Sequence, residues 1–333
     1  MSSNDLMILM GAPPAVWNIA SPEHVATLDS AHSRLTVERT DDQERFAAFL
    51  PEADAAFVFG PFIDLLRPAL EPGGRLRWIH SMPAGVDRLL TPEVRAATHI
   101  TLTSSKGPMG PLMAEHVVLM MLALARDLPG FLEDQAAKRW RFLADERPMR
   151  DLFGRTIAVL GTGAVGHNLT RICKNGFQMR VLGMSRSRRD DPHVDRFFDR
   201  AELHKMLAQA DFVALTMALT PETERIIDAE ALAAMKQSAY LINVSRGGLV
   251  DQEALIAALQ AGKIAGAGLD TATPEPLPEE SALWSLPNVI ITPHVSPGRD
   301  KIGEQMMAFW CENMRRFAEG EPLLGVVDRD AGY

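Results

Sequence analysis

The sequence has few cysteines, no long apolar run and no excess of positive charge. Cys173 and Cys311 are its only cysteines, too few for a disulfide framework or a cysteine-based zinc site, and we expect no metal. No apolar run reaches the roughly 20 residues of a membrane-spanning helix. The beginning, MSSNDLMILMG, lacks the basic segment of a signal peptide. The net charge of −9 argues against a nucleic acid or an anionic membrane as partner. We therefore expect a cytoplasmic globular protein.

Short apolar runs alternate with helical patterns along the chain, which is typical of parallel α/β folds. A length of 333 residues favours two domains. The first strands are expected at residues 6–10, 55–59, 75–81 and 99–105. Six more follow at 155–161, 179–185, 211–217, 239–244, 263–270 and 288–294. Residues 111–126 are apolar nearly all round and predict a buried helix, and residues 300–320 predict an amphipathic one.

The six later strands and their helices make one complete doubly wound unit, and the four earlier strands make a smaller one. Because no strand follows the last helix, it can return to the first unit and make that domain discontinuous. The predicted fold is α/β, with two doubly wound parallel-sheet domains. A Rossmann domain, residues 104–297, is inserted in a smaller flavodoxin-like substrate domain made of residues 1–103 and 298–333.

A glycine motif follows the first strand of the larger unit and opens a helix. Gly161, Gly163 and Gly166 have the G-x-G-x-x-G spacing in the strand–turn–helix context that dinucleotide binding requires. The helix N-terminus would supply amide hydrogens and its dipole to the phosphates. The alternative is a glycine-rich turn without a ligand. The residues expected to contact the cofactor here are Gly161, Thr162, Gly163, Ala164, Val165 and Gly166.

The end of the next strand indicates which dinucleotide binds. An Asp or Glu at this place would bind the ribose 2′-hydroxyl of NAD, but the chain has Ser185 followed by a basic turn. Guanidinium groups and hydroxyls can bind a 2′-phosphate instead. We predict NADP(H) as the preferred cofactor and NAD(H) as the alternative, with a merely solvated turn as the other interpretation. The residues concerned are Ser185, Arg186, Ser187 and Arg188.

Three polar residues follow the last strands of the same unit. Arg246 comes after YLINV, Glu275 lies in the loop after the next strand, and His294 follows NVIITP. Each of these residues alone could be an ordinary polar residue at the surface, where a strand ends. Together they would face one cleft, because ligands of open α/β sheets bind at the carboxyl ends of the strands.

These segments resemble the D-isomer-specific 2-hydroxyacid dehydrogenase family over essentially the whole chain. The resemblance is carried by SMPAGVDRLL, MAEHVVLMMLALAR, LGTGAVG, TPETERIID, LINVSRGGLVDQEAL, GAGLDTATPEPLP and LPNVIITPHVS. The basic turn and PEPLP are most similar to the NADP-preferring glyoxylate/hydroxypyruvate reductases. The resemblance implies reduction of a small 2-oxo acid to a D-2-hydroxy acid, or the reverse reaction.

The resemblance implies that His294 is the general acid and that Glu275 favours its imidazolium form. It also implies that Arg246 holds the substrate carboxylate and polarises the ketone. The substrate carboxylate would also contact backbone amides of the first domain. The residues implied there are Ala84, Gly85 and Val86. Further cofactor contacts are implied for Val244, Asp270 and Ser296.

The resemblance also implies a homodimer. Trp140 is interpreted either as a side chain that reaches the neighbouring subunit or as a buried anchor, and His80 and His116 are given structural roles. Two other functions remain open. One is a non-enzymatic NAD(P)-sensing scaffold of the same fold, and the other is an NAD-dependent dehydrogenase of the phosphoglycerate or phosphite branch.

Overall fold

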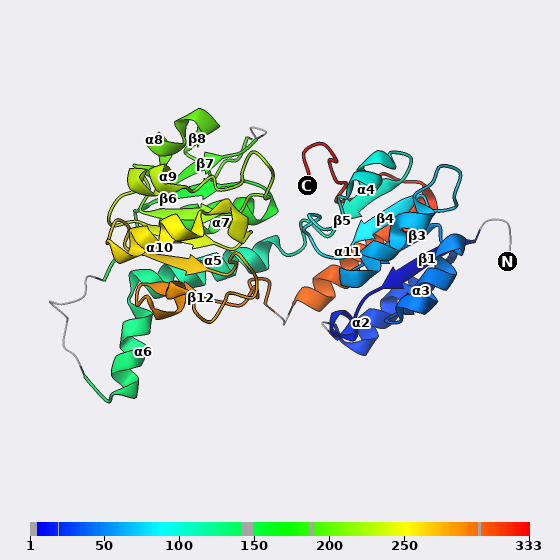
Figure 1. Ribbon diagram of the computed structural model, residues 1–333, viewed down its shortest axis with the longest axis horizontal. Helices are drawn as coiled ribbons and strands as arrows, with labels where there is room; N and C mark the ends of the chain where they lie inside the picture. The colour runs from blue at the N-terminus through cyan, green and yellow to red at the C-terminus, as the bar shows by residue number, and fades with distance from the viewer. Residues whose placement is uncertain (1–4, 19, 141–148, 187–189, 299–300) are drawn as a thin grey trace. The chain divides into compact units, whose positions relative to one another are not determined.

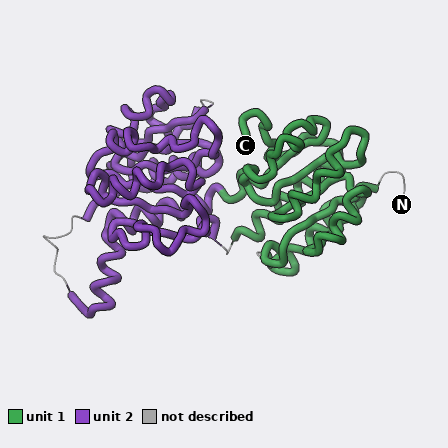
Figure 2. The backbone as a smooth tube through the Cα atoms, in the orientation of Figure 1, with its two compact units in different colours: residues 1–109, 299–333 green, residues 110–298 purple. Residues whose placement is uncertain are grey.

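A computed structural model describes residues 5–18, 20–140, 149–186, 190–298 and 301–333. The chain forms two compact units, which are coloured separately in Figure 2. Unit 1 comprises residues 1–109 and 299–333, and unit 2 comprises residues 110–298. Both are α/β units with parallel sheets, as the sequence predicts.

Unit 1 is built on a five-stranded parallel sheet of order β2-β1-β3-β4-β5. Its strands are β1 (Leu6–Gly11), β2 (Leu35–Thr40), β3 (Ala55–Val58), β4 (Trp78–Ser81) and β5 (Thr101–Ser104). Its helices are α1 (Pro14–Trp17), α2 (Pro22–Ala26), α3 (Gln43–Phe49), α4 (Pro92–Ala96) and α11 (Ile302–Glu319). The sequence pattern does not predict β2. This strand lies at the sheet edge and is mostly half-buried, so it carries polar residues and lacks the continuous apolar run of a central parallel strand.

The last helix packs on the sheet of unit 1. Met307, Trp310 and Met314 of α11 are buried against Ile8, Phe57 and Trp78 of the sheet. The opposite face of the sheet carries a second core that includes Phe46 of α3 and Val94 of α4. The C-terminal helix therefore completes the layer structure of the N-terminal unit, as Figure 1 shows.

Unit 2 is built on a seven-stranded parallel sheet of order β12-β11-β10-β9-β6-β7-β8. Its strands are β6 (Thr156–Leu160), β7 (Arg180–Met184), β8 (Arg196–Phe198), β9 (Phe212–Leu215), β10 (Tyr240–Asn243), β11 (Gly266–Leu269) and β12 (Val289–Ile291). Its helices are α5 (Gly110–Ala125), α6 (Leu128–Ala136), α7 (Ala164–Phe177), α8 (Leu203–Leu207), α9 (Ala229–Ala234) and α10 (Gln252–Gln260). The short edge strand β8 was not predicted.

Helices cover both faces of this sheet. Buried residues of α5 and α7 form one core with alternate residues of β6, while α8, α9 and α10 form the other. This is the doubly wound arrangement that the sequence predicts. The strand order places the turns after β10, β11 and β12 side by side, and the turns after β6 and β7 farther along the same edge.

The helix α5 and the segment after it differ from expectation. Although Met121 and Ala125 are fully buried, Leu119 and Leu122 of α5 are exposed. The prediction of a helix buried all round is therefore wrong for one face. The exposed fraction of Trp140 is 85%, which also rules out a buried anchor within its own chain. Figure 1 shows α6 extending away from the body of unit 2.

Candidate active site

The glycine turn between β6 and α7 has the geometry of a close backbone approach. Gly161 has a φ of +102°, and a Cβ there would lie 2.6 Å from the backbone nitrogen of Met217. A Cβ on Gly166 would lie 1.9 Å from the carbonyl oxygen of Gly161. A Cβ on Gly163 would meet nothing within 4 Å, so this glycine faces open space. Two glycines are thus needed for packing, and the third leaves room for a ligand.

This turn fits a pyrophosphate. Gly163 is the N-cap of α7, and no side chain caps the amide hydrogens of the first helical turn. Beside it, the hydroxyl of Thr162 is buried and has no hydrogen-bond partner among the described residues. Ala164 is exposed and Val165 is half-buried in the same first turn. The sequence-predicted residues 161–166 therefore lie together, with donors available for an anion.

The basic turn after β7 is attached to the glycine turn. The amide of Gly161 donates to the carbonyl of Met184, the last residue of β7, at 2.8 Å. Ser185 and Arg186 follow at once, with Arg186 exposed, whereas Ser187 and Arg188 lie outside the described residues. Beyond the turn, Asp191 is hydrogen-bonded at 2.9 Å to His167 on α7. The sequence pattern does not indicate this second attachment, although His167 directly follows the glycine motif.

The His294 ring is paired with Glu275. Its Nδ1 lies 2.9 Å from Oε2 of Glu275, and the other carboxylate oxygen accepts the amide hydrogen of Ala272 at 3.2 Å. The side chains of His294 and Glu275 are 45% and 40% exposed, so the pair itself adds little to stability. Because Nδ1 is engaged, Nε2 is the nitrogen that can exchange a proton with a ligand.

Asp270, the first residue after β11, holds the neighbouring loop after β12 that carries His294. Its buried carboxylate accepts hydrogen bonds from Thr292 Oγ1 at 2.6 Å and from the amides of Val295 and Ser296 at 2.9 Å each. Oδ1 takes two of these bonds and Oδ2 takes one, which leaves an acceptor position on Oδ2. The nearby hydroxyl of Ser296 is buried without a partner among the described residues. An acceptor beside a hydroxyl fits the amide group of a nicotinamide.

Arg246 stands at the end of β10 in a loop built by Asn243. The Asn243 side chain accepts the amide of Ser245 at 3.0 Å and donates to the carbonyl of Arg246 at 2.8 Å. Val244, immediately after β10, is buried. A Cβ on Gly247 would lie 2.0 Å from the carbonyl oxygen of Ala272, so this glycine lets the Arg246 loop lie against the loop of Glu275. Arg246 is half-buried, and its Nη1 donates to the carbonyl of Ser245 at 2.8 Å.

The predicted substrate-carboxylate loop lies in unit 1. Ser81, the last residue of β4, donates from its hydroxyl to the carbonyls of Pro83 and Gly85 at 3.2 Å each. Ala84 and Gly85 are half-buried, and Val86 is buried. Since Arg246, Glu275 and His294 belong to unit 2, a joint substrate site made with this loop stays a prediction.

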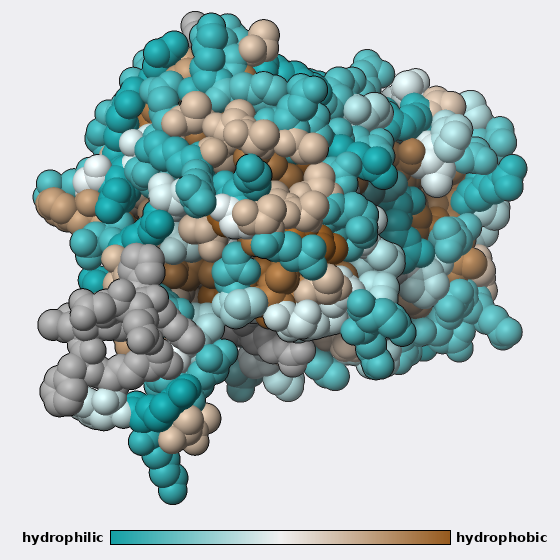
Figure 3. Space-filling view, turned by 60° about the vertical axis from the view of Figure 1, so that its left-hand side comes forward, coloured by the Kyte–Doolittle hydropathy of each residue, from teal (hydrophilic) through white to brown (hydrophobic). Residues whose placement is uncertain are grey.

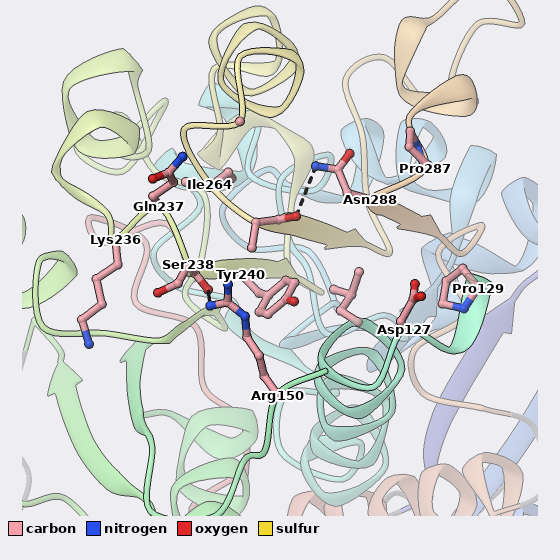
Figure 4. Close-up of a pocket in the computed structure, with 13 residues that line it drawn as sticks. Asp127, Pro129, Arg150, Lys236, Gln237, Ser238, Tyr240, Ile264, Pro287 and Asn288 are labelled. Carbon is pink, nitrogen blue, oxygen red and sulfur yellow. Dashed lines mark hydrogen bonds between the residues drawn. The ribbon is translucent and has the colours of Figure 1, made fainter. Parts of the chain in front are cut away.

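A separate hollow of about 650 Å³ lies at the opposite edge of the unit 2 sheet. It is lined at the amino ends of the strands by Ser238, Tyr240 and Asn288 (Figure 4). Two of the polar side chains that line it are hydrogen-bonded to the protein backbone. Arg150 donates to the carbonyl of Ser238 at 2.7 Å, and Asn288 donates to that of Ala265 at 3.2 Å. We therefore place the candidate active site at the carboxyl ends and not in this hollow.

Other kinds of site find little support in the described part of the chain. No cluster of three or more His, Cys, Asp or Glu side chains is suited to hold a metal ion there. Among the same residues, no helix combines the length and apolarity needed to cross a membrane. Burial raises the pKa of the Cys173 thiol to about 12, so this cysteine is not a nucleophile.

Comparison with known proteins decides the family. Residues 118–296, more than half of the chain, match the model for the D-isomer specific 2-hydroxyacid dehydrogenase, NAD binding domain. The chain belongs to this family. It is therefore an NAD(P)-dependent oxidoreductase of the 2-hydroxyacid dehydrogenase class.

Relatives of this dehydrogenase agree in sequence and in structure. Glyoxylate/hydroxypyruvate reductase A of Klebsiella pneumoniae (strain 342) is 33% identical over 287 residues, which cover 84% of this chain and 88% of the relative. A family protein from Aeromonas salmonicida is 34% identical with a TM-score of 0.81, covering 98% of this chain and 100% of the other. An NADPH-dependent glyoxylate/hydroxypyruvate reductase from Sinorhizobium meliloti, solved with NADP and sulfate, is 27% identical with a TM-score of 0.81, at 99% and 100% coverage.

The sequence alone does not place two further residues beside the loop of His294. Thr292 bonds to Asp270, and His116, to which we gave a structural role, bonds to Thr292 at 3.0 Å. The position of Thr292 two residues before His294 was the available signal. His116 lies 176 residues away in sequence from Thr292, and nothing in its apolar helix indicates this contact.

Proposed function

We propose that the protein is an NADPH-dependent reductase that converts small 2-oxo acids of the glyoxylate/hydroxypyruvate type to D-2-hydroxy acids. The observation that carries the proposal is the 2.9 Å pair of His294 Nδ1 and Glu275 Oε2. It lies on the loops after β11 and β12, directly beside the β10 loop of Arg246. The Klebsiella and Sinorhizobium relatives bear the names of reductases for these substrates.

The roles of the residues follow from this arrangement. Bound NADPH would supply a hydride from its nicotinamide ring to C2 of the oxo acid. His294 gives the proton from Nε2 to the ketone oxygen, because Nδ1 is held by Glu275. The Glu275 carboxylate stabilises the imidazolium before the transfer. His294 then regains a proton from water, so that one hydride and one proton are added to each substrate molecule.

Arg246 has the chemistry of an anion clamp. A planar guanidinium can pair with a carboxylate and at the same time donate to the ketone oxygen as negative charge develops there. Half-burial at the carboxyl end of β10 strengthens such contacts relative to open water. We propose that the backbone amides around Ala84, Gly85 and Val86 bind the same carboxylate when unit 1 meets the substrate.

Preference for NADPH is proposed from the end of β7. Ser185 and Arg186 stand there without the carboxylate that binds the 2′-hydroxyl of NAD. The preceding residue, Met184, is hydrogen-bonded to Gly161, so the turn starts beside the pyrophosphate turn. The NADP bound to the Sinorhizobium relative supports the same cofactor.

We further propose a homodimer formed through unit 2. Large apolar side chains are exposed along α5 and α6 and just beyond α6, namely Leu119, Leu122, Leu128, Phe131, Leu132 and Trp140. Figure 3 brings this side of unit 2 forward and shows apolar side chains gathered above α6. Several large exposed apolar side chains on neighbouring helices favour a protein partner, and a second copy is the partner available to a homo-oligomer.

The proposal is tested by measuring initial rates of NADPH and NADH oxidation with glyoxylate, hydroxypyruvate, pyruvate and phenylpyruvate. Chiral chromatography of the hydroxypyruvate product gives the stereochemistry, which glycolate, being achiral, cannot report. We expect D-glycerate. Light scattering gives the mass, and Leu132→Glu should halve it if the apolar surface forms the dimer.

A further inference from the structure

His116 connects helix α5 to the loop of His294. It lies on α5, its side chain is 13% exposed, and its Nε2 is 3.0 Å from Thr292 Oγ1. Thr292 directly follows β12 and stands two residues before His294. One side chain of α5 is thus bonded to the segment that carries the proposed general acid.

The hydrogen atoms of this contact can be assigned from its partners. Thr292 Oγ1 lies 2.6 Å from Asp270 Oδ1, and an ionised carboxylate can only accept. The Thr292 hydroxyl therefore donates to Asp270 and must accept from His116. The hydrogen of His116 consequently sits on Nε2, which is also 3.7 Å from the same Asp270 oxygen.

Hydrogen bonds to Asp270 hold the chain both before and after His294. Asp270 accepts the amides of Val295 and Ser296, and its own carbonyl accepts the amide of His294 at 2.9 Å. Between these anchors His294 has a φ of +54°, in the left-handed region that a residue with a Cβ rarely adopts. Such a conformation persists only where neighbouring contacts fix it.

We propose that His116 is a positioning residue for the reaction. Its Nε2–H fixes Thr292 and Asp270, and through them it holds His294 in the left-handed conformation in which the ring meets Glu275. This inference rests on the proposed role of His294. The glycine turn after β6 and the basic turn after β7 lie farther along the sheet edge, so they are outside this chain of bonds.

The first variants are His116→Leu and His116→Gln. Leucine removes the donor, whereas glutamine places an amide donor close to the position of Nε2. We expect His116→Leu to lower kcat about 10- to 100-fold, the effect of a small misplacement of a catalytic group, with the KM for NADPH changed less than about 3-fold. His116→Gln should recover most of the lost kcat. His204→Leu, at an exposed histidine of α8, is the matched control and should leave kcat unchanged.

Thr292→Val tests whether His116 acts through Thr292. If it does, the double variant His116→Leu/Thr292→Val has the kcat of Thr292→Val alone, because the second change has no bond left to remove. Multiplied losses would mean that His116 acts by another route, and the proposal would be wrong.

A second readout needs no cofactor and no turnover. Amide hydrogen exchange of Val295 and Ser296, followed by NMR in the free protein, should accelerate in His116→Leu and stay slow in His116→Gln. Unchanged exchange together with unchanged kcat overturns the proposal. The proposal is also overturned if both variants lose kcat equally and only in proportion to a loss of folded protein. If the wild-type protein reduces no 2-oxo acid but exchange changes as expected, the proposed function fails, while the structural part of the inference, that His116 holds the loop of His294, stands.

Discussion

His294 Nδ1 lies 2.9 Å from Glu275 Oε2, and these residues come from the loops that follow two neighbouring strands, β12 and β11. The pair is about half exposed, so it adds little to stability; the carboxylate oxygen lies against Nδ1 and leaves Nε2 as the ring nitrogen that can exchange a proton with a ligand. Next to this pair, Asp270 accepts hydrogen bonds from Thr292 Oγ1 and from the amide of Val295, on either side of His294 in the chain.

Removing the ring tests its role as the proton donor. His294→Ala should lower kcat about 10²- to 10⁴-fold, the usual contribution of a general acid. Added imidazole should restore part of the rate, because it can enter the space of the lost ring. Full activity without imidazole would remove His294 from the reaction. Glu275→Gln keeps the shape and should lower kcat while leaving the KM for NADPH nearly unchanged.

Arg246 is expected to stabilise the transition state more than the bound substrate. Arg246→Ala should cost about 10²- to 10³-fold in turnover, because a donor to the developing alkoxide is lost. Arg246→Lys keeps the charge but not the planar fork and should recover only part of the rate. Steady-state kinetics with glyoxylate measure both variants. Equal activity of Ala, Lys and wild type would place Arg246 outside the site.

The cofactor preference depends on the residues that follow β7. Arg186→Ala should raise the KM for NADPH and leave that for NADH almost unchanged, because a charge-assisted bond to the 2′-phosphate is worth about 10-fold or more. Ser185→Asp should favour NADH further, since a carboxylate repels the phosphate and binds a ribose hydroxyl. If both cofactors respond equally to Arg186→Ala, this side chain is structural.

His80 makes the stability of unit 1 depend on pH. Complete burial lowers its pKa to about 3, from an ordinary value near 6.5. Between these values the unfolded chain binds a proton that the folded chain does not. The free energy of unfolding should therefore fall as the pH drops below 6.5, by about 1.4 kcal/mol per pH unit from this group.

Urea unfolding of the wild type and of His80→Asn at pH 7.5, 5.5 and 4.5 measures this contribution. The wild type should lose more stability between these values than the variant, which lacks the titrating ring. Parallel losses would mean that His80 titrates alike in the folded and the unfolded chain, and that its burial does not lower its pKa.

The sequence was most informative where strands are central and buried. Tyr240–Asn243 reads as an apolar run because both faces of the strand are covered, and the polar loop after it was therefore easy to place. The edge strands β2 and β8 lack that signal, since one side of each is free of the sheet and polar residues are tolerated. The exposed face of α5 could not be foreseen either, because its apolar residues look the same whether a core or a second subunit covers them.

For the site, the sequence predicts which residues carry the chemistry but not how they are held. Arg246, Glu275 and His294 follow from strand ends and from the family resemblance. The bond from His116 to Thr292 joins residues far apart in the chain, and the left-handed φ of His294 cannot be recognised from the residue types around it. Such contacts can be identified only in the three-dimensional structure.

The most direct test of the account is the ratio of kcat/KM for NADPH and NADH, measured with purified protein on glyoxylate and hydroxypyruvate. The account predicts turnover of both substrates, with NADPH favoured by about 10-fold or more through the residues after β7. Equal or better use of NADH would contradict the assigned cofactor. Tight binding of NADPH without turnover of either acid would contradict the proposed substrate class.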